Sequence, residues 1–347
     1  MTRPDLLLLS LGTTRGLRAA DESFAEMVRA AGARVEVVGV RVGATRRLQR
    51  FYPAIDLVQA VAARRAAATA LARHQPRAVV VSTTTAALMA PLGGTPYAVR
   101  LDSPAVLNRP GRRNAMQHAL ERRSLAAARL VLPMSHAAQA ALPRGSAPSV
   151  VVPLPVAPSG PDGPRERLAV AYTPDPKAKG LDLLAEAWRI AAVPDARLEV
   201  FGIPAERGRA FLARFGIPEP PGLEWRGMVP ATEFRAALRR AHVHVTSARW
   251  EDFGQAQLEA LADGTLLATT PAGGPFEALA FARELDPRLV ATEISPPVLA
   301  TAIRAAFAVT DDEVGRYREG AAARLDPYRK ETVEDTIAHR VLPTLLD

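Results

Sequence analysis

Two glutamates stand eight residues apart in the segment ARWEDFGQAQLEALADG, residues 248–264. Glu251 lies near its start, and Glu259 lies in its mostly apolar middle, next to Leu258. A carboxylate in an apolar helix is unfavourable unless a partner binds it. If the segment is helical, the two glutamates lie about 12 Å apart along the helix axis. That span suits two hydroxyl-bearing rings, a ribose and a sugar, that are joined by a diphosphate.

Two predicted helix starts offer positive charge to such a diphosphate. Phe253 and Gly254 lie at the start of the helix that carries Glu259, so the positive end of its dipole faces the negative charge. Lys179 precedes Gly180 at another predicted helix start, where a cation opposes the local dipole. Because this placement is locally unfavourable, we interpret Lys179 as a phosphate-binding residue.

Glycines that follow predicted strands allow a ligand to approach the backbone closely. Gly273 and Gly274 follow the apolar run TLLATT and precede a helix that carries Glu277. Gly12 and Gly16 bracket a turn of small residues after the first apolar run, which suits an anion or a sugar. An ordinary loop or strand–helix turn is the alternative interpretation at both places.

Asp102 ends a predicted strand in RLDSP, where it is either a polar contact in a cleft or the first residue of an Asp-Ser-Pro turn. His242 and His244 face the same side of another predicted strand. No third ligand lies nearby in the sequence, so we predict no metal site. We also expect no other cofactor.

Short apolar runs alternate with helical stretches along the chain. This alternation predicts parallel sheets that are covered by helices on both faces, and these elements would position the residues described above. A first series ends at SVVVPLP, and a second begins at RLAVAY after a Pro- and Gly-rich linker at residues 153–166. The predicted fold class is therefore α/β, with Rossmann-like domains at residues 1–153 and 167–330. A helix at residues 331–347 is a candidate to pack back on the first domain. In such sheets, ligands bind at the carboxyl ends of strands.

The amino-acid composition and the charge exclude several classes of protein. The 347 residues include no cysteine, which excludes disulfide scaffolds and thiolate chemistry and suits the cytoplasm. The net charge of +8 comes almost entirely from arginine, which we attribute to a coding bias. Without aromatic residues among the arginines, no nucleic-acid surface is predicted. Residues 41–65 are basic with interspersed apolar residues; a solvated helix face is the favoured interpretation, and a peripheral membrane surface is the alternative.

Together these motifs resemble the retaining glycosyltransferases of family 4, which have the GT-B fold of two Rossmann-like domains facing a cleft. The resemblance rests on E-x-F-G-x-x-x-x-E at residues 251–259, on KGLDLLAEAW upstream and on DGTLLATTPAGGPFEAL downstream. It covers residues 168–325 in the order of the family, and the first half only by architecture. It implies transfer of a sugar from a nucleotide-diphosphate sugar to an acceptor hydroxyl, with retention of configuration.

The resemblance also implies roles for individual residues. Lys179 would hold the donor diphosphate, Glu251 the transferred sugar and Glu259 the ribose. The backbone near Met228 and Val229 would meet the base. The remaining donor-pocket residues would be Phe253, Gly254, Gly273, Gly274 and Glu277, with Gly12 bordering the cleft from the other domain.

Two departures from the family pattern keep alternatives open. The family commonly has an arginine six residues before the lysine, where this chain has Thr173, and a histidine where Asp102 stands here. A non-catalytic nucleotide-sugar-binding module is therefore one alternative. Another GT-B enzyme, such as a nucleotide-sugar epimerase that works by hydrolysis, is the second.

Overall fold

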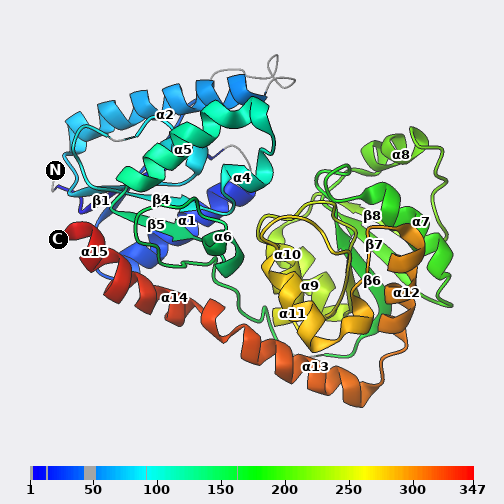
Figure 1. The fold of residues 1–347 in the computed structure, drawn as a ribbon. Coiled ribbons are helices and arrows are strands. Elements are labelled where there is room, and N and C mark those ends of the chain that lie inside the picture. The colour runs from blue at the N-terminus through cyan, green and yellow to red at the C-terminus, as the bar shows by residue number, and fades with distance from the viewer. Residues whose placement is uncertain (1–2, 13–14, 43–51, 91, 162) are drawn as a thin grey trace. The chain divides into compact units, whose positions relative to one another are not determined.

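The computed structural model describes residues 3–12, 15–42, 52–90, 92–161 and 163–347. The chain divides into two compact units. Unit 1 comprises residues 1–155 and 330–347, and unit 2 comprises residues 156–329. Each unit is a parallel sheet with helices on both faces (Figure 1).

The sheet of unit 1 is five-stranded, in the order β2-β1-β3-β4-β5. Its strands are β1 (Leu6–Ser10), β2 (Val35–Gly39), β3 (Ala78–Val81), β4 (Tyr97–Leu101) and β5 (Leu130–Pro133). The four-leucine run in β1 is fully buried because the sheet is covered on both faces. Leu7 and Leu9 face one hydrophobic core, and Leu6 and Leu8 face the other.

Helices α2 (Tyr52–His74) and α5 (Ala115–Ala127) cover one face of this sheet, and α1 (Arg15–Ala30) covers the other (Figure 1). Three short helices follow strands: α3 (Thr84–Ala87), α4 (Ala105–Asn108) and α6 (His136–Ala140). Thr83 and Ser135 cap α3 and α6 by accepting a backbone N–H three residues on, as N-cap hydroxyls do.

The end of the chain packs on the α1 face of unit 1. Helix α14 (Lys330–Thr336), a π turn (Ile337–Val341) and α15 (Leu342–Leu346) run on without a break. Proline lacks an N–H, so Pro343 cannot make the usual bond to the carbonyl four residues back, and the helix widens there. Buried apolar side chains from these elements join the core under α1: Val333, Ile337, Val341, Leu342 and Leu345.

The sheet of unit 2 is also five-stranded, in the order β10-β9-β6-β7-β8. Its strands are β6 (Glu166–Tyr172), β7 (Arg197–Phe201), β8 (Leu223–Gly227), β9 (Ala241–Thr246) and β10 (Leu266–Thr269). The chain moves outward from β6 to β8, and then returns to place β9 on the other side of β6. The strand order therefore reverses between β6 and β9, which is where open α/β sheets bind ligands.

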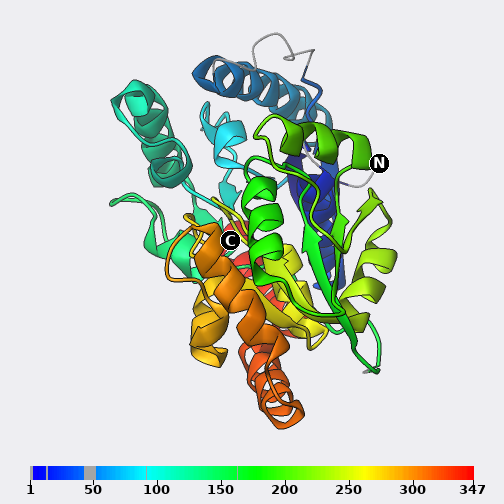
Figure 2. The ribbon, with the colours of Figure 1, turned by 90° about the vertical axis from the view of Figure 1, so that its right-hand side faces the viewer.

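Seven helices surround the described part of this sheet: α7 (Leu181–Ala191), α8 (Ala205–Ala213), α9 (Ala231–Arg240), α10 (Gln255–Ala262), α11 (Glu277–Leu285), α12 (Pro296–Phe307) and α13 (Asp311–Arg324). Side chains of α9 and α10 form a core with β6 and β7. Helices α7 and α12 pack together on the other face (Figure 2). The ring centroids of Trp188 and Phe307 lie 6.3 Å apart.

Candidate donor site in unit 2

Two loops meet at the point where the strand order of unit 2 reverses. One follows β6 and contains Lys179, and the other follows β9 and contains Arg249 and Glu251. The backbone N–H of Arg249 donates to the carbonyl of Ala178, at 2.9 Å. The hydroxyl of Ser247 donates to the carbonyls of Lys179 and Gly180, at 2.9 and 2.8 Å. These bonds fix the two loops against each other.

Lys179 and Glu251 form an ion pair at this junction. The ammonium nitrogen of Lys179 lies 2.7 Å from both carboxylate oxygens of Glu251, although the residues are 72 positions apart in the sequence. Glu251 is buried, whereas the side chain of Lys179 is 22% exposed. A cation held at the rim over a buried carboxylate is still accessible to a negatively charged ligand.

Two glycines make the close approach of these loops possible. Gly180 has φ +64°, and a Cβ there would lie 2.1 Å from the carbonyl oxygen of Ser247. Gly274 has φ +99°, and a Cβ there would lie 2.3 Å from the carbonyl oxygen of Glu251. Both distances are impossible for a real side chain, so the residue type at these positions is dictated by the backbone. Gly273 accepts from the N–H of Glu251 at 2.9 Å.

A second ion pair anchors the loop that leads to Glu251. Arg249 donates through both terminal nitrogens to Asp182 in the first turn of α7, at 2.8 and 2.6 Å. Burial alone would raise the pKa of Asp182, but the arginine fork outweighs burial and lowers it. Arg249 is therefore committed to Asp182 and fixes the backbone just before Glu251.

The expectation that one helix carries both glutamates is wrong. Helix α10 begins at Gln255, and Gly254 caps it with φ +85°, a left-handed conformation that interrupts any helix from residue 252. Glu251 instead lies before the helix, in the loop after β9, where its N–H donates to the carbonyl of Gly273. The two glutamates are not stacked along a helix axis, so the 12 Å estimate does not apply.

Glu259 lies on α10, half-buried. Burial raises the pKa of its carboxyl, and the hydrogen bond from Gln255 and the charge of Arg235 offset this only in part. The amide of Gln255 donates to it at 3.1 Å. A carboxylate with an elevated pKa and incomplete solvation is a strong acceptor for a hydroxyl donor.

Sequence reasoning missed two glutamines on the same helix. Gln257 is buried and donates to Glu251 at 3.0 Å and to the hydroxyl of Thr246 at 3.2 Å. Gln255 donates to Glu259. The signal was present, because amide side chains in a mostly apolar helix raise the same question as the glutamates did.

Other predicted donor residues lie around this core of the site. Phe253 is buried, with its ring centroid 6.4 Å from that of Tyr328. Glu277 is buried and accepts from the hydroxyl of Tyr328 at 2.5 Å, so its side chain is engaged within unit 2. Burial and the charge of Glu277 raise the pKa of Tyr328.

Three further positions follow strands of unit 2. Met228 and Val229 come directly after β8, where Met228 is exposed and Val229 half-buried. Thr173 comes directly after β6 and is buried; its hydroxyl has no hydrogen-bond partner among the described residues. A neutral hydroxyl therefore occupies the position where the resemblance implied an arginine.

Gly12 and Asp102 belong to unit 1. Gly12 follows β1 with φ +53°, and its carbonyl accepts from Arg18 at 2.5 Å. Asp102 follows β4 and is half-buried. The neighbouring Arg100 is fully buried and pairs with Asp21 at 3.2 Å. Residues 13–14, in the turn after Gly12, lie outside the described residues.

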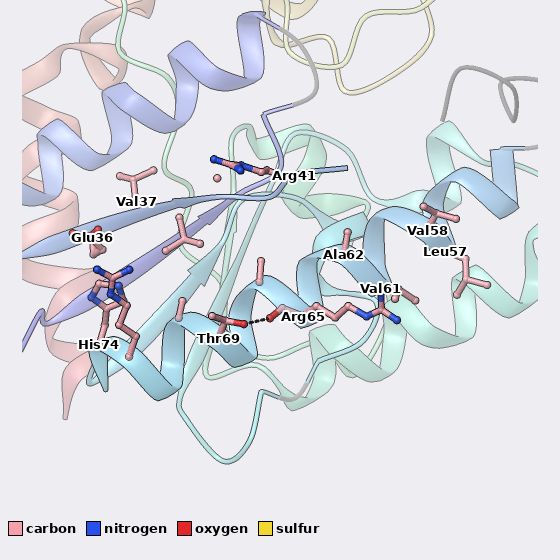
Figure 3. Close-up of a pocket in the computed structure, with 15 residues that line it drawn as sticks. Glu36, Val37, Arg41, Leu57, Val58, Val61, Ala62, Arg65, Thr69 and His74 are labelled. Atoms are coloured by element: carbon pink, nitrogen blue, oxygen red, sulfur yellow. Dashed lines mark hydrogen bonds between the residues drawn. The ribbon is translucent and has the colours of Figure 1, made fainter. Parts of the chain in front are cut away.

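A groove with a volume of about 930 Å³ lies on unit 1 between β2 and α2 (Figure 3). Val37, Val58 and Val61 line it with Arg41 and Arg65, and none of the predicted site residues is among its lining. It includes part of the basic segment at residues 41–65, of which residues 43–51 lie outside the described residues.

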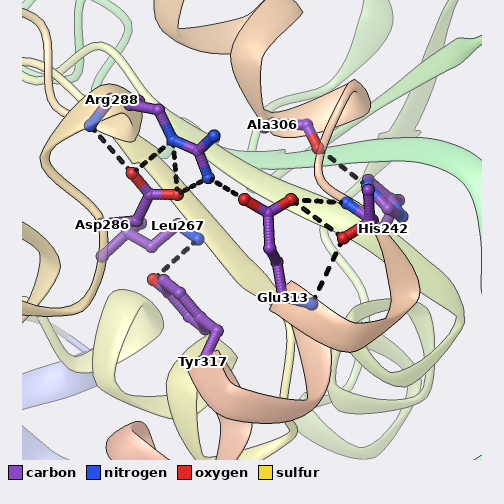
Figure 4. Close-up of polar contacts among 8 residues, drawn as sticks. His242, Leu267, Asp286, Arg288, Ala306, Glu313 and Tyr317 are labelled. Atoms are coloured by element: carbon purple, nitrogen blue, oxygen red, sulfur yellow. Dashed lines mark hydrogen bonds and ion pairs between the residues drawn. The ribbon is translucent and has the colours of Figure 1, made fainter.

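The paired histidines of β9 are engaged in packing. His242 lies 2.9 Å from the carbonyl of Ala306 (Figure 4). Its ring stacks on that of Phe307. His244 is buried, and burial lowers its pKa to about 4. Among the described residues, no three His, Asp or Glu side chains are grouped as metal ligands. No helix in the described ranges is long and apolar enough to span a membrane.

Residues 166–308 match the family model described as glycosyl transferases group 1. The match begins at β6, ends just after α12, and contains the Lys179–Glu251 pair together with Glu259 and Gly273–Gly274. A search of curated protein sequences found no match.

Solved structures resemble the whole chain. A sucrose-phosphate synthase from Thermosynechococcus elongatus superposes with a TM-score of 0.71 at 15% identity, covering 97% of both chains. A UDP-forming α,α-trehalose-phosphate synthase from Burkholderia xenovorans gives 0.70 at 13% identity, covering 100% of both chains. Another structure of such a synthase from that organism, in complex with glucose-6-phosphate, gives 0.62 at 13% identity and covers 82% of this chain and 78% of that one. At these identities the likeness establishes the fold, and the predicted GT-B class of two Rossmann-like α/β units is confirmed.

Proposed function

We propose that this protein is a retaining glycosyltransferase that moves a sugar from a nucleotide-diphosphate sugar to an acceptor hydroxyl. The observation that carries the proposal is the contact between Lys179 and Glu251, at 2.7 Å, where the strand order of unit 2 reverses. The match of residues 166–308 to glycosyl transferases group 1 supports it independently.

In this proposal Lys179 stabilises the departing diphosphate. When the bond between the anomeric carbon and the diphosphate oxygen breaks, negative charge grows on that oxygen. A preorganised cation nearby lowers the barrier because it already points at the developing charge. The positive end of α7, which begins at Leu181, adds to the same field without a metal ion.

The remaining roles are assigned by chemistry and by the resemblance. Glu251 accepts from a hydroxyl of the transferred sugar, and Glu259 accepts from the ribose. The backbone after β8, near Met228 and Val229, meets the base. Backbone N–H groups near Gly273 and Gly274 approach the donor. In unit 1, Asp102 is assigned a catalytic role, and Gly12 is assigned to the donor-binding residues, at the border of the cleft.

A donor screen tests the reaction. The protein is incubated with a panel of nucleotide-diphosphate sugars and hydroxyl acceptors, and products are detected by mass spectrometry. The panel includes glucose-6-phosphate, because one structurally similar synthase binds it. Proton NMR of an early product then gives its anomeric configuration. Inversion contradicts the retaining assignment, and an absence of transfer across the panel contradicts transferase activity.

A non-catalytic nucleotide-sugar-binding module is the second candidate, favoured by one observation. Thr173 places a buried neutral hydroxyl where the family pattern has an arginine, which removes one cation from the diphosphate site. Isothermal titration with nucleotide diphosphates, followed by a donor-hydrolysis assay, separates the two. Binding without turnover favours the module, and hydrolysis with an epimerised sugar favours an epimerase.

A further inference from the structure

Two glutamines of α10 each donate to one of the two glutamates of the proposed donor site. Gln255 donates to Glu259 at 3.1 Å, and Gln257 donates to Glu251 at 3.0 Å. The proposed function assigns no task to either amide. Gln257 is the more constrained of the two, since it is buried on the face of α10 that packs toward β9.

The geometry of Gln257 leaves its amide a single orientation. An ionised carboxylate only accepts hydrogen bonds, so the NH₂ end of the amide must face Glu251. The same nitrogen lies 3.2 Å from the hydroxyl of Thr246, at the end of β9. The two N–H groups therefore bridge the strand end and the carboxylate, which anchors Glu251 to the sheet through a neutral group.

In the proposed function, Lys179 provides a weaker anchor once a donor is bound. A lysine ammonium has three N–H donors, and Glu251 takes two of them in this structure. A diphosphate competes for the same ammonium with more charge and more acceptor oxygens. Its binding therefore loosens the Lys179–Glu251 pair, and Glu251 then depends on its other partner.

We infer that Gln257 is a positioning residue that holds the carboxylate of Glu251 toward the transferred sugar when Lys179 turns to the diphosphate. The inference rests on the proposed function, because it takes Glu251 as the sugar-binding group. It deepens that function by naming the residue that maintains the site after the ion pair of the ligand-free state has loosened.

Gln257→Leu removes both N–H donors at similar volume and is the first test. We expect kcat to fall about tenfold to a hundredfold, the scale of a lost hydrogen bond to a charged group. Affinity for the free nucleotide diphosphate should change less than about twofold, because that ligand lacks the sugar. Gln139→Leu makes the same chemical change in unit 1, where Gln139 donates to Ser149, and should leave kcat unchanged.

Gln257→Glu is the second test, and its readout is a pH profile. At neutral pH it places a second carboxylate beside Glu251, and we expect activity at or below that of Gln257→Leu. On acidification the new carboxyl gains a proton and can donate again. The ratio of variant to wild-type kcat should therefore rise as the pH is lowered. A purely structural role for Gln257 predicts a constant ratio and a lower melting temperature.

Isothermal titration separates failure of this inference from failure of the proposed function. In the wild type, intact donor should bind more tightly than nucleotide diphosphate. In Gln257→Leu this difference in affinity should disappear, even if no transfer occurs. If Gln257→Leu keeps both the affinity difference and the kcat of the wild type, the inference is wrong, but the proposed function stands. Equal weakening of both ligands also overturns it. A wild type that binds neither ligand overturns both the inference and the proposed function.

Discussion

Both units hold an ion pair near the carboxyl ends of their parallel strands, but the two pairs differ in access to solvent. In unit 1, the side chains of Arg100 and Asp21 are 0% and 2% exposed. In unit 2, those of Lys179 and Glu251 are 22% and 10% exposed. Two nitrogens of Arg100, Nε and Nη2, have no hydrogen-bond partner among the described residues, whereas the lysine pair is supported by Gln257.

The difference separates a pair that holds the fold from one that can exchange partners. An enclosed arginine cannot reach a ligand without opening the core, and its charge is compensated by the carboxylates of Asp21 and Asp102 and by the ring of Phe24, 5.2 Å away. Lys179 needs only to turn at the surface. The four predictions below test this contrast, from the largest expected effect to the smallest.

Breaking the enclosed pair should give the largest loss of stability. Asp21→Ala leaves the guanidinium of Arg100 buried without the carboxylate that pairs with it, which costs about 3–5 kcal/mol in the free energy of unfolding. Urea denaturation followed by far-UV circular dichroism measures it. The tryptophans, Trp188, Trp225 and Trp250, all lie in unit 2, so their fluorescence reports that unit separately.

Replacing both partners is the matched control. Asp21→Leu combined with Arg100→Met removes both buried charges and should recover most of the lost stability. If Asp21→Ala proves as stable as the wild type, Arg100 finds another counter-charge and our description of unit 1 is wrong.

Breaking the accessible pair should affect turnover more than stability. Lys179→Met should lower kcat by about 10²–10³-fold, or about 3–4 kcal/mol, because the diphosphate loses a preorganised cation. The unfolding free energy should change less than in Asp21→Ala, since the lysine is partly solvated and Gln257 still donates to Glu251. Steady-state kinetics and urea denaturation on the same preparation test both statements. A large loss of stability with normal turnover would show that Lys179, like Arg100, holds the fold and does not act on the donor.

A buried neutral base gives unit 2 a distinct response to acid. Burial lowers the pKa of His244 from 6.5 to about 4, outweighing a hydrogen bond with the backbone of Val170. The unfolded state therefore binds a proton more readily, and stability present above pH 6.5 is lost as the pH falls toward 4. The loss is about 3 kcal/mol. Urea unfolding monitored by tryptophan fluorescence should show this loss of stability. In His244→Leu, the unfolding free energy should depend less on pH in the same range.

The smallest expected effect distinguishes the two glutamates. Glu259→Gln should weaken nucleotide diphosphate and intact donor alike, by about 1.5–3 kcal/mol. Glu251→Gln should spare the nucleotide diphosphate and reduce turnover of the donor. Because burial raises the pKa of Glu259, affinity should also fall on acidification at a pH above the ordinary glutamate range. Glu259→Gln should lack this step. Titration calorimetry measures the affinity of both variants for the nucleotide diphosphate. An equal loss of this affinity in both would contradict the role of Glu251.

The sequence was sufficient for the class of fold because apolar runs and helical stretches alternate along the chain. It also indicated that Lys179 and Glu251 follow parallel strands, whose carboxyl ends meet at one edge of a sheet. Their roles in donor binding stay predictions. It did not reveal that the two side chains touch. That contact depends on how the loops after β6 and β9 meet, 72 residues apart, and no local pattern encodes it.

The helix boundary at residue 255 was missed for a local reason. Acidic residues at 251 and 252 resemble the first turn of a helix, and we took them as such. Gly254 was interpreted as part of the helix start that faces a negative charge, and its left-handed conformation as the N-cap was not anticipated. The buried partner Asp21 was missed because burial of a polar side chain is a property of the packed structure, whereas the amide of Gln257 in a mostly apolar helix was a signal that could have been used.

The return of α14 and α15 to unit 1 has a consequence for the order in which the protein assembles during translation. Val333, Ile337, Val341 and Leu345 belong to the core beneath α1, yet the ribosome makes them after every residue of unit 2. Unit 2 is thus contiguous and can fold as it emerges, whereas the earlier-synthesised residues 1–155 wait with an open apolar face. Chaperones would meet that face throughout the synthesis of the 174 residues from 156 to 329.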